Sequence, residues 1–263
     1  MLIFLPLCLF FGLMLPADFM AIRFNFPQQK TDQNFPLNMV EDSVDDMYFG
    51  CSQKMTEKVK AVYFVEEMKS KAFADAWNKA LECAKKKPMV EDRALTKDHM
   101  QAICVYTAND IYSTFNGAVR TQGGDYSAFK FHSLHYLLTS AIQILNSNNH
   151  CHTTYRRTSV KFTGQENQTI RFGSFASSSF YEGLTDFGNE TCFKIKTCSG
   201  AFLKNYSTFD DEAEVLIPPY ETFRITKNIT GPRKYGELKD CKVVYELESA
   251  GSASRLNCKA VYP

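Results

Sequence analysis

In the first half of the chain, apolar side chains recur every three or four residues, which places them on one face of a helix. This pattern begins at Gln53 and ends before the lysine run 85–87. A second helix is expected to start at Thr96, a residue type that is common at helix N-termini. Two further apolar stripes, at residues 111–119 and 131–145, predict two more helices.

After residue 151 the pattern changes to short runs of β-branched and aromatic residues between turn-forming residues, which is typical of strands. The runs are residues 159–162, 169–172, 175–181, 193–197, 215–217, 223–229 and 241–247. Helices first and strands afterwards predict an α+β fold. We expect a helical half at about residues 52–149, packed on a mixed β-sandwich at about residues 150–263 with a cleft between them.

The first residues carry a different apolar pattern. Residues 2–15 are almost entirely apolar, which is too short to cross a bilayer but suits the apolar core of an export signal. We expect a signal peptide at residues 1–21, cleaved after Ala17 or Ala21, with a buried first helix as the alternative. Residues 241–263 are interrupted by charged side chains, so no membrane anchor is expected there.

Charge is nearly balanced along the chain, with 30 Lys and Arg against 29 Asp and Glu. A nucleic acid or an anionic membrane surface is therefore not indicated as a partner. The length of 263 residues and the hydrophobic fraction of 44% suit one large globular domain.

Cysteine usage also indicates export. Eight cysteines remain after the signal peptide, an even number that suits disulfides in an oxidising compartment. Cys83 and Cys104 bracket a short connection between two predicted helices and are expected to form a local disulfide. Sequons provide candidate glycosylation sites at Asn167, Asn189, Asn205 and Asn228. The mature protein is therefore expected to be secreted.

Two histidine arrangements raise the question of a metal site. His132 and His135 lie three residues apart on a predicted helix, and His150 and His152 flank Cys151. The first pair has no further ligand at a suitable spacing, and in an exported chain a disulfide at Cys151 is favoured over zinc. No metal is expected.

A pair of glutamates precedes one of the predicted strands. Glu212 and Glu214 are separated by one residue and lead into the apolar run 215–217 and the prolines 218–219. In an extended segment, residues i and i+2 point to the same face, so both carboxylates are expected to enter one cavity. A solvated acidic turn is the alternative.

Two upstream segments change the interpretation of this pair. They are Tyr155-Arg156-Arg157, which is expected to begin the first strand, and Phe175-Ala176-Ser177-Ser178-Ser179, which is expected to form a hydroxyl-rich strand. With the later Glu212-Ala213-Glu214 and its apolar run, they resemble the R-S-ExE signature of the arginine-specific mono-ADP-ribosyltransferases of vertebrate cell surfaces and secretions. The resemblance covers about residues 40–245 and includes residues 45–51, 108–120, 187–188, 197–200 and 218–223.

The resemblance implies a role for each signature residue. Arg156 would hold NAD in the cleft, because a guanidinium presents a planar fork to phosphate or ribose oxygens. Ser177 would position the nicotinamide ribose and orient the catalytic glutamate, which would be Glu214. Glu212 would select arginine as the acceptor.

Two further positions, Tyr106 and Ser207, match residues that contact NAD in that family. Ser207 is also the third residue of the Asn205 sequon, so a glycan and a bound nucleotide would conflict there. Arg157 stands where similar proteins often have a small residue, which is expected to change the phosphate contacts.

Family resemblance also implies two disulfides, Cys51–Cys241 and Cys151–Cys198. It leaves Cys192 and Cys258 unassigned, and spacing alone cannot pair them.

Together these features predict a secreted, monomeric enzyme with a single domain at residues 22–263. It would transfer ADP-ribose from its co-substrate NAD to arginine side chains of extracellular proteins, without a metal. One alternative is a secreted NAD glycohydrolase, against which the presence of Glu212 argues. The other is an inactive secreted binding protein with the same fold, which would be expected to lack a catalytic residue.

Overall fold

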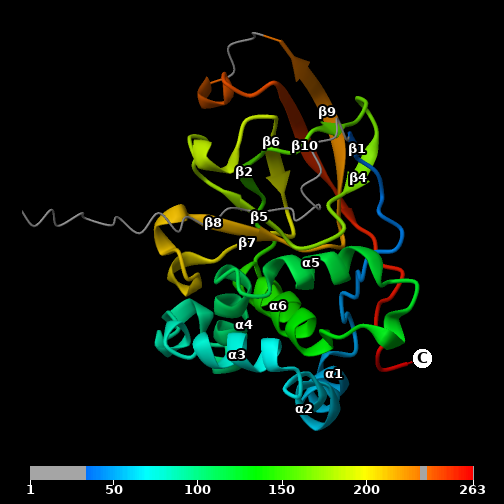
Figure 1. Cartoon of the computed structure of the whole chain (residues 1–263), viewed down its shortest axis with the longest axis vertical. Coiled ribbons are helices and arrows are strands. Elements are labelled where there is room, and N and C mark those ends of the chain that lie inside the picture. The colour runs from blue at the N-terminus through cyan, green and yellow to red at the C-terminus, as the bar shows by residue number, and fades with distance from the viewer. Residues whose placement is uncertain (1–33, 232–235, 263) are drawn as a thin grey trace, which may run out of the picture.

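The computed structural model describes residues 34–231 and 236–262 (Figure 1). The predicted signal peptide at residues 1–21 lies outside these residues. Figure 1 shows the helices gathered at one end of the molecule and most of the strands at the other. The predicted α+β fold is confirmed.

The helical part lies between residues 52 and 145. Its helices are α1 (Ser52–Lys58), α2 (Phe64–Glu67), α3 (Lys71–Lys79), α4 (Lys97–Thr107), α5 (Tyr112–Thr121) and α6 (His132–Leu145). A π-helical turn at Val59–Tyr63 joins α1 to α2. α4 begins as predicted, because the Thr96 hydroxyl accepts a hydrogen bond from His99 N while the His99 ring accepts one from Thr96 N.

The strands form an eight-stranded sheet in the order β4-β9-β10-β6-β2-β5-β8-β7, and β1 pairs with β3. Their bounds are β1 (Phe35–Pro36), β2 (His152–Thr158), β3 (Phe162–Thr163), β4 (Thr169–Arg171), β5 (Ala176–Ser179), β6 (Thr191–Thr197), β7 (Ala201–Phe202), β8 (Glu214–Ile217), β9 (Glu221–Thr230) and β10 (Val243–Ser252). The first strand, expected from Tyr155-Arg156-Arg157 with a run at residues 159–162, does include Tyr155, Arg156 and Arg157 but is wrong in its bounds. β2 occupies residues 152–158, because His152 already pairs with Thr197 of β6.

Pairing in the large sheet is weakest between β2 and β5, the two strands that carry Arg156 and Ser177. β2 pairs with β6 along its whole length but with β5 only where Tyr155 lies opposite Ser179. In Figure 1, β5, β7 and β8 run across the view above the helices, whereas β6, β9 and β10 extend away from them. The sheet therefore turns at this junction.

Two hydrophobic cores support the sheet on either side of the turn. The larger core joins the helices to β7, β8 and the residue before β5, through buried residues such as Phe175 and Leu216. The second core packs around Phe193 and Phe223 and also includes Ala176 of β5 and Ile217 of β8. Each large apolar side chain that is fully buried stabilises the folded state by roughly 1.5–3 kcal/mol relative to the same side chain left in water.

Four disulfides link the described residues. The predicted pairs Cys83–Cys104 and Cys151–Cys198 are confirmed. The implied pair Cys51–Cys241 is wrong, because Cys51 bonds Cys258 and Cys241 bonds Cys192.

Strand neighbours and the C-terminal tail explain the corrected pairing. β10 lies parallel to β6 with Val244 opposite Cys192, so Cys241, just before β10, lies near Cys192. The tail after β10 returns to the helical part, where Asp46 accepts a backbone hydrogen bond from Cys258 at 2.8 Å. That contact brings Cys258 beside Cys51.

The sequons lie on the β part of the molecule. Asn167, Asn189 and Asn205 are exposed, whereas Asn228 is half-buried and its amide donates to the Gly164 carbonyl at 3.2 Å. Within residues 34–231 and 236–262, none of the helices has the length and apolar character that a membrane crossing requires.

Candidate active site

The four residues of the signature converge on one cavity at the turn of the sheet. Arg156 comes from β2, Ser177 from β5, and Glu214 is the first residue of β8, preceded by Glu212. The cavity is lined by Tyr155, Arg156, Arg157, Ser177, Ser178, Ser179, Tyr181, Leu184, Phe187, Glu212 and Glu214. Segments that are 20 to 60 residues apart in the chain thus meet because β5 lies between β2 and β8.

Glu214 is the most buried carboxylate of the cavity, with 3% of its surface exposed. Ser207 Oγ donates a hydrogen bond to its Oε2 at 3.0 Å, and its Oε1 has no partner among the described residues. Burial raises the pKa of Glu214, and the hydroxyls of Ser177 and Ser207 and the charge of Arg156 oppose that rise. One carboxylate oxygen is therefore buried without a hydrogen-bond partner among the described residues.

Arg156 and Ser177 are joined across the break in strand pairing. Arg156 is 2% exposed and its Nη1 donates to the Ser177 carbonyl, which ties its guanidinium to β5. The Ser177 hydroxyl is buried, and although it lies near enough to lower the pKa of Glu214, it makes no hydrogen bond with any described residue. It is thus a second unsatisfied polar atom in the cavity.

Glu212 reaches the cavity by a different geometry from the one predicted. It ends a 3₁₀ turn, Asp210–Glu212, and the next residue, Ala213, is left-handed with φ 47°. The two glutamates therefore do not share one face of an extended strand, and that reasoning was wrong although both side chains line the cavity. Burial, then the charges of Glu214 and Asp211, raise the pKa of Glu212 to about 7.

The two further NAD-contact candidates, Tyr106 and Ser207, are not among the residues that line the cavity. Tyr106 is buried in α4, where its hydroxyl donates to the Phe175 carbonyl at 3.1 Å and accepts from Asn116 at 3.2 Å. Ser207 is buried and directed at Glu214, whereas Asn205 of the same sequon is exposed. A glycan on Asn205 and the Ser207 hydroxyl therefore point in different directions.

Arg157 does not offer its guanidinium to a ligand. The guanidinium makes a bidentate pair with Asp240 at 2.9 and 3.1 Å and donates to the carbonyls of Glu182 and Glu237. The Arg157 side chain leaves β2 on the face opposite to Arg156, because neighbouring residues of a strand point to opposite faces.

Arg120, on α5, is a residue that the sequence analysis did not single out. Burial, and then the nearby charge of Arg156, lower its pKa to about 10. Its guanidinium has no hydrogen bond or ion pair with any described residue, so a positive charge lies near Arg156 without a carboxylate of its own. The only indication in the sequence that Arg120 belongs to the site was its position at the end of residues 108–120, one of the segments that carry the family resemblance.

Of the histidines considered as metal ligands, His132 and His135 are buried in the core, whereas His150 is exposed and His152 half-buried. His135 lies 2.8 Å from the Tyr48 hydroxyl and 2.9 Å from the Val44 carbonyl, and the His132 ring stacks on Tyr63. Burial lowers the pKa of both imidazoles, to about 3 and about 4 respectively. No group of three or more potential metal ligands occurs among residues 34–231 and 236–262.

Comparisons with known proteins agree with this geometry. The family model of NAD:arginine ADP-ribosyltransferases matches residues 37–237. An erythroblast NAD(P)(+)–arginine ADP-ribosyltransferase of Gallus gallus is 33% identical over 241 residues, which are 86% of this chain and 76% of the relative. The GPI-linked NAD(P)(+)–arginine ADP-ribosyltransferase 1 of Homo sapiens is 32% identical over 256 residues, 87% and 75% of the two chains.

Solved structures give the same result. The eucaryotic mono-ADP-ribosyltransferase ART2.2 matches with a TM-score of 0.71 and 31% identity, over 87% of this chain and 100% of that one. A mutant of ART2.2 in complex with NADH matches with a TM-score of 0.71 and 30% identity, over the same shares of both chains. The chain belongs to the NAD:arginine ADP-ribosyltransferase family.

Proposed function

We propose that this protein transfers ADP-ribose from NAD to arginine side chains and releases nicotinamide. The observation that carries the proposal is that Arg156, Ser177, Glu212 and Glu214 line one cavity in a member of this family. A single ADP-ribosyltransferase domain at residues 22–263 would hold the whole site.

Unsatisfied polar atoms of the cavity suit NAD. The Ser177 hydroxyl and one oxygen of Glu214 have no partner among the described residues, and ribose hydroxyls would complete both. Arg156 lowers the pKa of the nearby Arg120, and the diphosphate of NAD would compensate the charge of Arg120. These contacts favour a dinucleotide over a small neutral sugar.

The reaction exchanges one bond at the anomeric carbon of the nicotinamide ribose. The bond to the nicotinamide nitrogen breaks, nicotinamide leaves with the electron pair, and positive charge develops on the sugar. The carboxylate of Glu214 stabilises this charge more than it stabilises the ground state, which lowers the barrier. A guanidine nitrogen of the acceptor then bonds to the same carbon and loses a proton.

Glu212 is suited to the acceptor half of this reaction. Its pKa of about 7 lies close to physiological pH, so its carboxylate can both orient the acceptor guanidinium and take up its proton. Among the described residues no cation pairs with the Glu212 side chain, which leaves the carboxylate available.

We further propose that the enzyme acts outside the cell as a secreted protein. Support comes from the four disulfides, which persist in oxidising compartments, and from the signal expected at residues 1–21. Relatives with names such as ecto-ADP-ribosyltransferase point the same way.

One incubation tests the activity. Purified protein is given labelled NAD with either a small arginine derivative or buffer alone, and nicotinamide release and label on the acceptor are measured. We expect label on the acceptor. Nicotinamide release without acceptor labelling would identify an NAD glycohydrolase, and neither product would identify an inactive protein.

A further inference from the structure

Tyr181 is an exposed aromatic residue at the cavity that no step of the proposed reaction uses. Its side chain lines the same cavity as Glu212 and Glu214, and the residue is 55% exposed. A large aromatic ring left half in water beside carboxylates needs a physical reason, because burial of the ring would stabilise the fold.

The backbone holds Tyr181 close to Glu212. β5 and β8 are antiparallel and end where Ser179 lies opposite Glu214, and hydrogen bonds join the two segments that follow and precede this pair. One hydroxyl joins both residues, since Ser179 Oγ donates to the Glu212 carbonyl at 2.6 Å and accepts from Tyr181 N at 2.8 Å. Phe180 N also donates to the Ala213 carbonyl at 3.2 Å. The two side chains therefore leave the backbone at the same mouth.

An arginine side chain has two recognisable parts that match this pair. The edge of the guanidinium donates hydrogen bonds, which a carboxylate accepts, and its flat faces stack on aromatic rings. Glu212 provides the carboxylate. Burial and the neighbouring charges of Glu214 and Asp211 disfavour its ionised form, which an adjacent cation would favour. Tyr181 provides the ring.

We propose that Tyr181 stacks on the acceptor guanidinium and is a specificity-determining residue that acts with Glu212. The inference rests on the proposed transfer to arginine and goes beyond it by naming the wall that holds the acceptor. An ammonium group can also lie over a ring but has no flat face to stack on it, so the same pair favours arginine over lysine.

The test compares the unaltered protein with Tyr181→Ala and Tyr181→Phe. Steady-state transfer to arginine methyl ester gives KM for the guanidine, and hydrolysis of NAD without acceptor reports on the NAD half of the site. Tyr262→Ala is the matched control, because Tyr262 is 52% exposed and its ring lies against Lys54, outside the cavity.

We expect Tyr181→Ala to raise KM for the guanidine by roughly 3–10-fold, the effect of losing one partly exposed cation–π contact. NAD hydrolysis should stay within about twofold, and Tyr181→Phe and Tyr262→Ala should behave like the unaltered protein within the same margin.

Three results would overturn the inference. The first is an unchanged KM for the guanidine in Tyr181→Ala. The second is a rise in that KM in Tyr181→Phe as large as in Tyr181→Ala, and the third is a fall in the rate of NAD hydrolysis in Tyr181→Ala as large as the rise in KM. The failure of the proposed function looks different, since the unaltered protein itself would then label no guanidine, and the inference would fall with it.

Discussion

Glu212 and Glu214 are separated by a single residue, yet their surroundings assign them different chemistry. Glu214 is 3% exposed and held by Ser207, whereas Glu212 is half-buried at the mouth of the cavity. The left-handed Ala213 between them sends the two side chains along different paths. The inner carboxylate can therefore face the sugar of NAD while the outer one faces the acceptor.

Replacement of the inner carboxylate tests bond cleavage. Glu214→Gln keeps the shape and the acceptor atom for Ser207 but removes the negative charge. We expect both arginine transfer and NAD hydrolysis to fall by about 100-fold or more, since preorganised charge at such a centre is worth that much. The measurement is nicotinamide release with and without acceptor. Substantial remaining hydrolysis would remove Glu214 from the catalytic role.

Replacement of the outer carboxylate tests acceptor choice. Glu212→Gln is expected to lose arginine transfer by about tenfold or more while it keeps NAD hydrolysis, because only the guanidinium loses its charged partner. Labelling of arginine methyl ester, measured beside nicotinamide release, separates the two activities. Undiminished labelling of the acceptor would contradict the assigned role.

Glu212→Gln should also change how the ratio of arginine transfer to NAD hydrolysis depends on pH. The pKa of Glu212 is raised to about 7, so its carboxyl is mostly neutral below that pH and ionised above it. The acceptor guanidinium stays charged throughout this range. The ratio of transfer to hydrolysis should therefore rise as pH increases through about 7, and Glu212→Gln should remove this step. A step that persists in the variant would assign it to another group.

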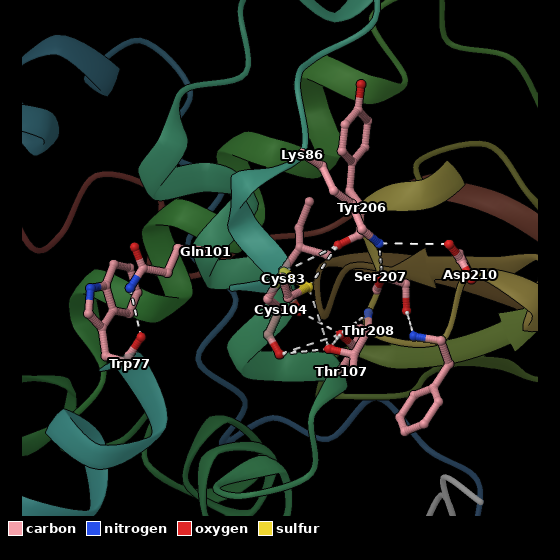
Figure 2. The surroundings of a disulfide bond; sticks show 12 residues. Trp77, Cys83, Lys86, Gln101, Cys104, Thr107, Tyr206, Ser207, Thr208 and Asp210 are labelled. Atoms are coloured by element: carbon pink, nitrogen blue, oxygen red, sulfur yellow. Dashed lines mark hydrogen bonds and ion pairs between the residues drawn. A yellow bond between two sulfur atoms is a disulfide. The ribbon is translucent and has the colours of Figure 1, made fainter. Parts of the chain in front are cut away.

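At the scale of elements, the segment before β8 is tied to the helical part. Figure 2 shows the Cys83–Cys104 disulfide beside the Tyr206 carbonyl, with Thr107 of α4 directed at Thr208. Thr107 Oγ1 accepts a hydrogen bond from Thr208 N at 2.9 Å and lies 3.0 Å from Thr208 Oγ1. Ser207 lies between Tyr206 and Thr208, which both contact α4, and its hydroxyl donates a hydrogen bond to Glu214. Through these contacts α4 positions the carboxylate of Glu214.

A substitution in α4 tests this positioning. Thr107→Val keeps the shape but removes the acceptor of Thr208 N, and we expect unfolding free energy to fall by about 1 kcal/mol. Displacement of Ser207 should lower kcat by roughly tenfold with little change in KM for the guanidine. Thr107→Ser retains the hydroxyl and should restore kcat. An equal loss of kcat in both variants would show that packing, rather than the hydrogen bond, matters.

Helix periods predicted α4, α5 and α6 well, whereas the run 159–162 placed much of the first strand too late in the chain. β2 instead has Tyr155, Arg156 and Arg157 at its centre, which are polar or charged and do not form the apolar run of a buried strand. Both guanidiniums are nonetheless buried, one against β5 and the other against Asp240. Tertiary partners thus override the local pattern.

At the scale of the whole molecule, the neighbouring carboxylates of Asp45 and Asp46 bind the C-terminal tail at residues 255–258. Asp45 is fully buried, pairs with Arg171 at 2.6 Å and accepts backbone hydrogen bonds from Arg255 and Leu256. Asp46 holds Cys258 in the same way. This network joins the N-terminal segment, the sheet and the C-terminal tail.

Removal of the buried charge should destabilise the fold strongly. Asp45→Asn leaves Arg171 buried without its counter-charge, and we expect unfolding free energy to fall by about 3–5 kcal/mol. Urea unfolding with disulfides intact measures it. Glu41→Gln is the control, because Glu41 and Arg255 form an exposed pair, with side chains 66% and 65% exposed, worth about 0–1 kcal/mol. Equal losses in the two variants would refute the importance of burial.

The sequence by itself determined the order of helices and strands and the chemical identity of the signature residues, because periodicity and residue type are local properties. Tertiary structure alone decided the partners of Cys51 and Cys241, since these depend on which strands become neighbours and where the tail returns. It also brought Arg120 near Arg156 and held Tyr181 and Glu212 at one cavity. Such contacts join segments far apart in the chain, and no local pattern encodes them.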